Sequence, residues 1–458
     1  MEVTTTLARK IVDTTYDSLS SQILWETKRH ILDTLGVMFP PTTLERACKV
    51  LAEIAVEGGG KTESTLVGFG GKVPCWTAAF VNGSLCHPMD YDDIADEFSS
   101  HPSAQTFPAA LAIAERVGNA SGKEFLTAIA LGIDLNVRLS ASPRGSLMQD
   151  YPWFPITIFG VFSSTAVAGK LLRLSHKQMV NAFGIALDRA SGVTESIASP
   201  DSEIRAIRDG FGNREGLLAA LMAKRGVTAC RDAIEKLFKV FYRNNNDFSL
   251  FTSDLGKEFW GLKVGFKPWP CCRVAHTYIK AGLDLAMRYD LNPERIEEVI
   301  LTVGSLARDI PFNPIEEKQK PKLSISAKLS LPFIMGVVFT KRRVAIKDFL
   351  PENLGDLEVL ELAKKVKPKF DPHLCEGALE PGVVEVRIQG GESYVNREEL
   401  PYGHPRNPMS DEELVAKFKD CTLYAKKAFS EEKVSQLVER IFNLETVKSL
   451  NEITDLLA

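Results

Sequence analysis

The region between residues 102 and 174 contains three runs that decide the fold class: PSAQTFPAALAIAERV (102–117), GKEFLTAIALGIDLNVRL (122–139) and GVFSSTAVAGKLLRL (160–174). Each run is rich in Ala, Leu, Ile and Gly, and none shows the alternation of apolar and polar residues that is typical of a strand. Small residues at this density suit helices that pack closely against one another. We therefore expect the chain from about residue 76 to residue 226 to form a helical bundle.

The character of the sequence changes near Phe266, where two prolines interrupt the segment KPWPCCR. A helix is expected from about Cys272 to Tyr289, and the β-branched segment IEEVILTVG (296–304) predicts a strand. The segment GVVEVRIQGGESYV (382–395) alternates in the same way and predicts a hairpin with Gly-Gly near its turn. These elements indicate a second domain of the α+β class.

A further helix is expected in SAKLSLPFIMGVVF (326–339), despite its internal proline. The chain after residue 410 is helical again, because Ser410 and Glu413 have the spacing of a capping box. The expected fold is mainly α with a second α+β domain. An all-helical domain would comprise residues 1–265 with 400–458, and the α+β domain residues 266–399.

Composition and charge restrict the function. The 458 residues include 55 Lys and Arg and 59 Asp and Glu, a net charge of −4, which argues against broad nucleic-acid or membrane-surface binding. The longest apolar stretch and the charged N-terminus predict neither a membrane span nor a signal peptide, so we expect a cytoplasmic protein. Eight cysteines without a CxxC pair indicate neither a disulfide framework nor a zinc ribbon.

The most unusual segment is HPMDYDDIADEFSSHPS (87–103). Asp90, Asp92 and Asp93 would repel one another if all three were desolvated, so at least one should bind a cation, exchange a proton or cap a backbone. A carboxylate beside a histidine is a usual general acid/base pair. The alternative is a loop of capping aspartates. A metal site is the weaker reading, since His87, Asp90 and His101 have no recognised ligand spacing.

Two further segments carry candidate chemistry. In KPWPCCRVAH (267–276), a helix beginning near Cys271 would place Cys272 and His276 one turn apart, with positive charge from Lys267 and Arg273 nearby. The alternative is a pair of buried thiols. In DSEIRAIRDGFGNREG (201–216), two arginines suit a carboxylated ligand, and the alternative is an exposed charged turn.

Together these segments resemble the MmgE/PrpD family. The resemblance rests on four stretches in the family's order: NGSLCHPMDYDDIADEFSSHPS (82–103), RDGFGNREG (208–216), GFKPWPCCRVAH (265–276) and GHPRNPMSDEELVAKF (403–418). It implies a large helical domain built from both chain ends, a smaller α+β domain, a homodimer and an active site that needs no organic cofactor. The implied partner is a small anionic di- or tricarboxylate substrate.

The resemblance implies roles for Asp90, His101, Lys267, Arg205 and Cys272, and the chemistry of the residues suggests the other candidates. The catalytic candidates are His101, Asp90, Lys267, Cys272 and Tyr151. The substrate-binding candidates are Arg205, Arg208, Arg273, Asp93 and His276. No cofactor-binding or metal-binding residue is assigned.

Several positions differ from those of the decarboxylase members of the family. Arg205 falls where those relatives carry a lysine, and Arg208 replaces the histidine three residues after that lysine. Ile94 replaces a threonine, and Phe154 and Cys272 each replace a histidine. We expect a lyase or isomerase that removes a proton next to a carboxylate, foremost a hydro-lyase similar to 2-methylcitrate dehydratase. The alternatives are an isomerase similar to iminodisuccinate epimerase, a carboxy-lyase similar to cis-aconitate decarboxylase, or a non-catalytic carboxylate-binding protein.

Overall fold

The computed structural model describes residues 2–145, 150–194, 196, 202–252, 254–374 and 379–457. The chain divides into two compact units, of which unit 1 comprises Met1–Val264 and Ser410–Ala458, and unit 2 comprises Gly265–Met409. Unit 1 is built mainly from helices, and unit 2 combines helices with a four-stranded sheet, so the expected fold class is confirmed. Within the described residues, no helix is both long and apolar enough to cross a membrane.

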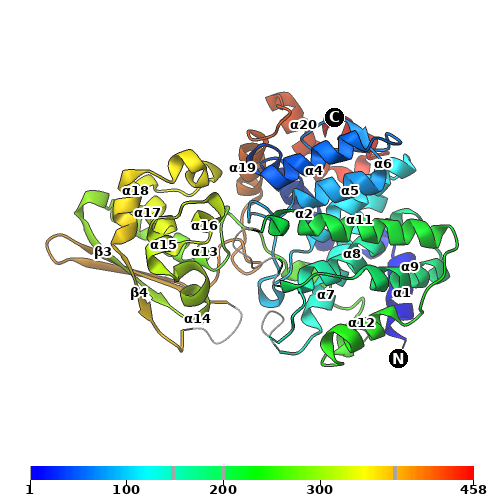
Figure 1. The fold of residues 1–458 in the computed structure, drawn as a ribbon, viewed down its shortest axis with the longest axis horizontal. Helices are drawn as coiled ribbons and strands as arrows, with labels where there is room; N and C mark the ends of the chain where they lie inside the picture. The colour runs from blue at the N-terminus through cyan, green and yellow to red at the C-terminus, as the bar shows by residue number, and fades with distance from the viewer. Residues whose placement is uncertain are drawn as a thin grey trace. The chain divides into compact units, whose positions relative to one another are not determined.

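Unit 1 is organised around α8 (Pro155–Leu171), in which every residue except Lys170 is buried. Helix α11 (Ile204–Lys224) packs along α8 and along α5 (Cys75–Ser84) (Figure 1). A methyl group at Gly216 of α11 would lie 2.5 Å from Ser164 Cβ, which is too close for any larger residue. The small residues of the sequence therefore allow the close helix contacts that were expected from them.

The remaining helices surround this centre. They are α1 (Val3–Asp13), α2 (Ser21–Val37), α3 (Pro41–Leu44), α4 (Arg46–Glu57), α6 (Phe107–Val117), α7 (Gly122–Ala141), α9 (His176–Arg189), α12 (Ala233–Tyr242), α19 (Asp411–Thr422), α20 (Glu431–Phe442) and α21 (Asn451–Leu457).

The C-terminal segment belongs to unit 1, where α19 packs against α2. Its start is the predicted capping box: the Glu413 N–H donates to Ser410 Oγ at 3.2 Å, and the Ser410 N–H donates to Glu413 Oε2 at 2.8 Å. The ring of Phe418 fills the space beside Gly36 of α2, where an added methyl would lie 3.0 Å from it. These contacts attach the end of the chain to a helix near its beginning.

Unit 2 contains a sheet with strand order β4-β3-β5-β6. Strand β3 (Ile296–Val303) pairs in parallel with β4 (Val366–Phe370) and antiparallel with β5 (Gly382–Ile388), which pairs antiparallel with β6 (Ser393–Glu398) (Figure 1). The predicted hairpin is confirmed, and Gly390 and Gly391 both adopt positive φ at its turn. Helices α13 (Ala275–Arg288), α17 (Leu331–Lys341) and α18 (Leu357–Lys364) complete the core of this unit.

Two predicted helix boundaries in unit 2 are wrong. The helix expected over residues 326–339 is two helices, α16 (Ser324–Lys328) and α17, because Pro332 can occupy only the first turn of a helix and so α17 restarts at Leu331. The helix expected from Cys272 begins at Ala275, and the Cys272 N–H donates to the Lys328 carbonyl of a distant segment at 3.0 Å.

Candidate active site

The loop that follows α5 folds back on itself and brings its two histidines together. Asp90 adopts a left-handed φ of 53°, and its N–H donates to the His87 carbonyl at 2.8 Å, which closes a tight turn. Further along the loop, Ala95 and Ser100 form an antiparallel bridge. The ring of His101 consequently lies beside that of His87, with 4.7 Å between their centroids.

One carboxylate, that of Asp92, contacts both imidazoles. His87 Nδ1 lies 3.1 Å from each Asp92 oxygen, and His101 Nδ1 lies 3.0 Å from Asp92 Oδ2. His101 Nδ1 also donates to the Asp93 carbonyl at 2.8 Å. Because carboxylate and carbonyl oxygens only accept, the Nδ1 atom of each ring carries a proton. The Nε2 atoms are then the ones that can exchange a proton with a ligand.

His87 is neutral near pH 7. Burial lowers the pKa of His87 to about 4; the positive charges of Arg208 and His101 act in the same direction, and Asp92 opposes them. The Nε2 atom of this neutral ring is an acceptor, and it lies 3.4 Å from Arg205 Nη2. His87 is therefore suited to orient its neighbours and poorly suited to store a proton.

Two arginines of α11 supply positive charge beside the histidines. Arg205 Nη2 donates to Asp90 Oδ2 at 3.1 Å. The buried Arg208 guanidinium lies 4.3 Å from the centre of the Phe154 ring, and its Nε donates to Asp209 Oδ1 at 3.4 Å. The two arginines are three residues apart on one helix and so share a face. The alternative of an exposed charged turn is therefore wrong, since these residues lie within α11 and Arg208 is buried.

The structure gives Asp93 and Tyr151 other surroundings. The Asp93 carboxylate points into the protein, where it accepts from the N–H and hydroxyl of Ser103 and lies 2.9 Å from His30 Nδ1. The Tyr151 hydroxyl contacts the Arg144 carbonyl at 3.4 Å and accepts from Asn245 Nδ2 at 3.3 Å. Asp93 thus faces the interior, and Tyr151 contacts neighbouring loop residues.

The other four candidates lie in unit 2, and all are buried. Arg273 Nη1 donates to the carbonyls of Phe266 and Tyr402 at 3.1 and 3.0 Å and lies 3.4 Å from His276 Nδ1. Cys272 precedes α13, so the expected helical spacing of Cys272 and His276 is wrong. Lys267, in the same segment, has only 1% of its surface exposed. This group combines a guanidinium and an amine with a thiol.

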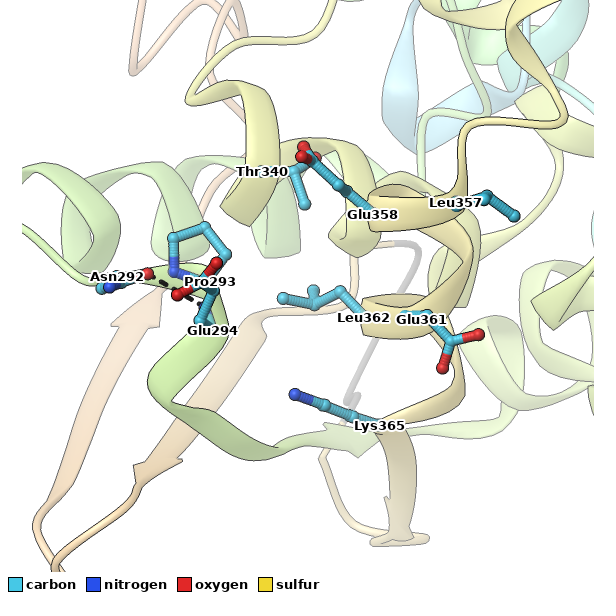
Figure 2. A pocket seen from close by; sticks show the side chains of 9 residues that line it. All are labelled: Asn292, Pro293, Glu294, Thr340, Leu357, Glu358, Glu361, Leu362 and Lys365. Carbon is cyan, nitrogen blue, oxygen red and sulfur yellow. Dashed lines mark hydrogen bonds between the residues drawn. The ribbon is translucent and has the colours of Figure 1, made fainter.

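The cavities of the two units differ in their suitability for an anion. Unit 1 has a cavity of about 360 Å³ lined by Arg189, Arg208 and Arg214 and by two acids, Asp188 and Glu215. Asp188 pairs with Arg189, and Glu215 pairs with Arg214. Unit 2 has a pocket of about 580 Å³, shown in Figure 2, in which three glutamates accompany a single lysine. Those residues are Glu294, Glu358, Glu361 and Lys365, and Lys365 Nζ already donates to the Ile296 carbonyl at 2.6 Å. The lining of the unit 1 cavity has one more positive than negative group, whereas the lining of the unit 2 pocket has an excess of negative charge, which opposes a carboxylate.

The residue types of His87, Asp92 and His101 would also suit a metal ion, and their ligand atoms lie within 4.8 Å of one another. Two observations weaken that reading. The Nδ1 protons already account for the spacing around Asp92, and the Arg205 guanidinium lies 3.4 Å from the ring of His87. A positive group at that distance disfavours a cation at the cluster.

Several residues of this network were not among the sequence candidates. His87 and Asp92 stand in the quoted acidic segment, where their position next to His101 and Asp90 was the available signal. His30 and Asp33 of α2 and Lys417 of α19 had no such signal, because packing alone brings them to the loop.

Family models match both parts of the chain. The family model described as the MmgE/PrpD N-terminal domain matches residues 5–249, and the model of the MmgE/PrpD C-terminal domain matches residues 269–444. A cis-aconitate decarboxylase of Mus musculus is 27% identical over 99% of this chain and 93% of its own length. The cis-aconitate decarboxylase of Homo sapiens is 26% identical over 96% and 91%, and that of Aspergillus terreus is 25% identical over 96% and 93%.

Proposed function

Because the chain belongs to the MmgE/PrpD family, we propose that it is a lyase that removes a proton next to a carboxylate of a small di- or tricarboxylate, without an organic cofactor. The observation that carries the proposal is the contact of two imidazoles with the single carboxylate of Asp92, beside Arg205 and Arg208. Such a site combines a base with fixed positive charge, as proton removal next to a carboxylate requires.

His101 is the proposed base. Its Nδ1–H contacts the Asp93 carbonyl and the Asp92 carboxylate, so Nε2 is the nitrogen that can act on a substrate. The Asp92 carboxylate also stabilises the ring once it is protonated. His87 has a pKa of about 4 and therefore does not compete for that proton. The proton taken from the substrate stays on His101 Nε2.

Arg205 and Arg208 are the proposed carboxylate ligands, and Asp90 orients Arg205. Loss of the proton places negative charge on the substrate carboxylate, where a guanidinium stabilises it. In a hydro-lyase the β-carbon–oxygen bond then breaks, the electron pair forms the double bond, and His101 Nε2 returns its proton to the departing hydroxide as water. One imidazole performs both transfers, so the elimination is expected to be syn.

Two other reactions fit this site less well. Decarboxylation, the reaction named for the relatives, requires a carboxylate to lose its charge as CO₂, and a guanidinium bound to it stabilises the starting state instead. An epimerase requires acid/base groups on opposite faces of one carbon, whereas the rings of His87 and His101 lie side by side. A hydro-lyase therefore leads, and the relatives keep the carboxy-lyase as the second candidate.

We also propose roles for the other residues that the sequence suggested. Lys267 and Cys272 are further candidates for contact with the substrate, and Arg273 and His276 for holding the segment that carries them. Tyr151 is the weakest of the catalytic candidates, given the contacts of its hydroxyl. We also propose a homodimer, which light scattering on the purified protein will test.

Proton NMR in D₂O with a panel of carboxylates tests the function. The panel contains methylcitrate, citrate, cis-aconitate, malate and iminodisuccinate. We expect loss of water to give the unsaturated product and, as the reaction reverses, deuterium to enter the remaining hydroxy acid beside a carboxylate. We expect His101→Gln to abolish both. The matched control is His176→Gln, because His176 lies at the surface and contacts Asp13.

Each alternative has its own result in this experiment. Exchange with inversion and no loss of water indicates an epimerase, and loss of CO₂ indicates a decarboxylase. Tight binding without exchange in both the parent protein and His101→Gln indicates a carboxylate-binding protein. Absence of exchange and of binding across the whole panel contradicts the proposal.

A further inference from the structure

The loop that carries the proposed base is attached at its back to α2 and α19. Lys417 of α19 donates from Nζ to the Tyr91 carbonyl at 2.7 Å, and the same Nζ lies 2.6 Å from Asp33 Oδ1 of α2. It also lies 3.9 Å from the centre of the Tyr91 ring. Both charged side chains are buried, so the ion pair is shielded from water and holds the loop at Tyr91.

Asp93 connects this attachment to His101. Its carboxylate is held by Ser103 and lies 2.9 Å from His30 Nδ1, which is one turn from Asp33 on α2. Its backbone carbonyl accepts from His101 Nδ1 at 2.8 Å. Because the carboxylate and the carbonyl belong to one residue, fixing the first restricts the direction of the second. A change in the position of the His30 ring would therefore change the direction of the Asp93 carbonyl that accepts from His101 Nδ1.

We propose that His30 is a positioning residue, which acts through Asp93 to keep the proton of His101 on Nδ1 and leave Nε2 as the base. The inference rests on the proposed function of His101. A merely structural role would not require a histidine here, since an apolar side chain fills a buried helix face without the cost of desolvating an imidazole. The ring instead has Nδ1 2.9 Å from the Asp93 carboxylate, and it acts against the rise that burial causes in the pKa of Asp33, one turn along α2.

Three variants of α2 separate positioning from packing. His30→Leu removes the polar contact with Asp93, and His30→Asn keeps a donor near the position of Nδ1. Thr34→Ala is the matched control, because Thr34 is equally buried one turn away and its hydroxyl donates only to the His30 carbonyl. We expect His30→Leu to lower kcat roughly 10- to 100-fold with KM changed less than about threefold, since a misplaced base loses rate before binding.

The pattern across the variants and across pH decides the test. His30→Asn should recover most of the lost rate, and Thr34→Ala should stay within about twofold of the parent. The acid limb of the kcat profile should move in His30→Leu and stay in place in Thr34→Ala. Equal losses in His30→Leu and Thr34→Ala, with an unmoved profile, would overturn the inference. If His30→Leu does not fold, Ser103→Ala removes another donor to Asp93 and should show the same loss.

A second readout does not depend on turnover. The protein has seven histidines, so ¹⁵N-histidine labelling with His101→Gln as a difference spectrum identifies the signals of His101. We expect the Nδ1–H tautomer in the parent and a mixture with Nε2–H in His30→Leu. An unchanged tautomer in folded His30→Leu contradicts the inference. If the parent protein turned over no carboxylate, that result would contradict the proposed function alone. The tautomer of His101 in His30→Leu would then still decide the positioning role.

Discussion

Lowering the pH from 7 to 5 should cost unit 1 a measurable part of its stability through His87. Burial holds the pKa of His87 at about 4 in the folded protein, whereas an unfolded histidine titrates near 6.5. The unfolded chain therefore binds more protons between these values, so stability falls as the pH falls through that window. A shift of about 2.5 units corresponds to about 3.4 kcal/mol, of which about 2 kcal/mol is already lost at pH 5.

His87→Asn isolates this contribution, because asparagine keeps a donor near the position of Nδ1 toward Asp92 but does not titrate. We would measure the free energy of unfolding by urea at pH 7, 6 and 5 for the parent, for His87→Asn and for the surface control His176→Gln. The parent and the control should lose about 2 kcal/mol more than His87→Asn between pH 7 and pH 5. Equal losses in all three proteins, or an NMR titration of His87 near 6.5, would refute the reasoning.

Three further outcomes follow from the same contacts. Asp92→Asn should lower kcat roughly 10²- to 10⁴-fold with little change in KM, because it removes the charge shared by the two imidazoles; steady-state kinetics will check this. Arg205→Gln should raise KM roughly 10- to 100-fold, since a charge-assisted hydrogen bond is worth about 1.5–3 kcal/mol; an unchanged KM would remove Arg205 from the substrate site. Gly216→Val should destabilise the protein by about 1–3 kcal/mol through its clash with Ser164, whereas Gly355→Ala, which meets nothing within 4 Å, should not lower the midpoint of thermal unfolding.

The fold could be predicted where local chemistry decides it. The capping box at Ser410 and the Gly-Gly hairpin are fixed by residues within a few positions of each other, and both are present. The boundary near Pro332 was misplaced because apolar periodicity continues across a proline that the backbone does not tolerate inside a helix. The boundary near Cys272 was misplaced because the Cys272 N–H donates to the carbonyl of Lys328, which is distant in the sequence. Periodicity therefore predicts that a helix exists better than where it starts.

The candidate site could likewise be predicted only where its residues are close in the sequence. His87, Asp92 and His101 lie in one short segment, so their proximity could be inferred from the sequence. Arg205 reaches Asp90 across 115 residues and Lys417 reaches Tyr91 across 326, and only the packed structure relates them. The direction of the Asp93 side chain was equally hidden, because neighbouring aspartates in a loop can point to opposite sides.

The replacements that distinguish this chain restrict its chemistry in one direction. Arg208 carries a charge that it does not release, and the Phe154 ring that lies against it exchanges no proton. His87 is held neutral by burial. Among the groups assembled around Asp92, these restrictions leave His101 as the proposed residue that both takes and returns a proton. In syn elimination of water, one proton leaves the substrate carbon and joins the departing hydroxide on the same face. Such a reaction fits this site better than one that needs two independent acids.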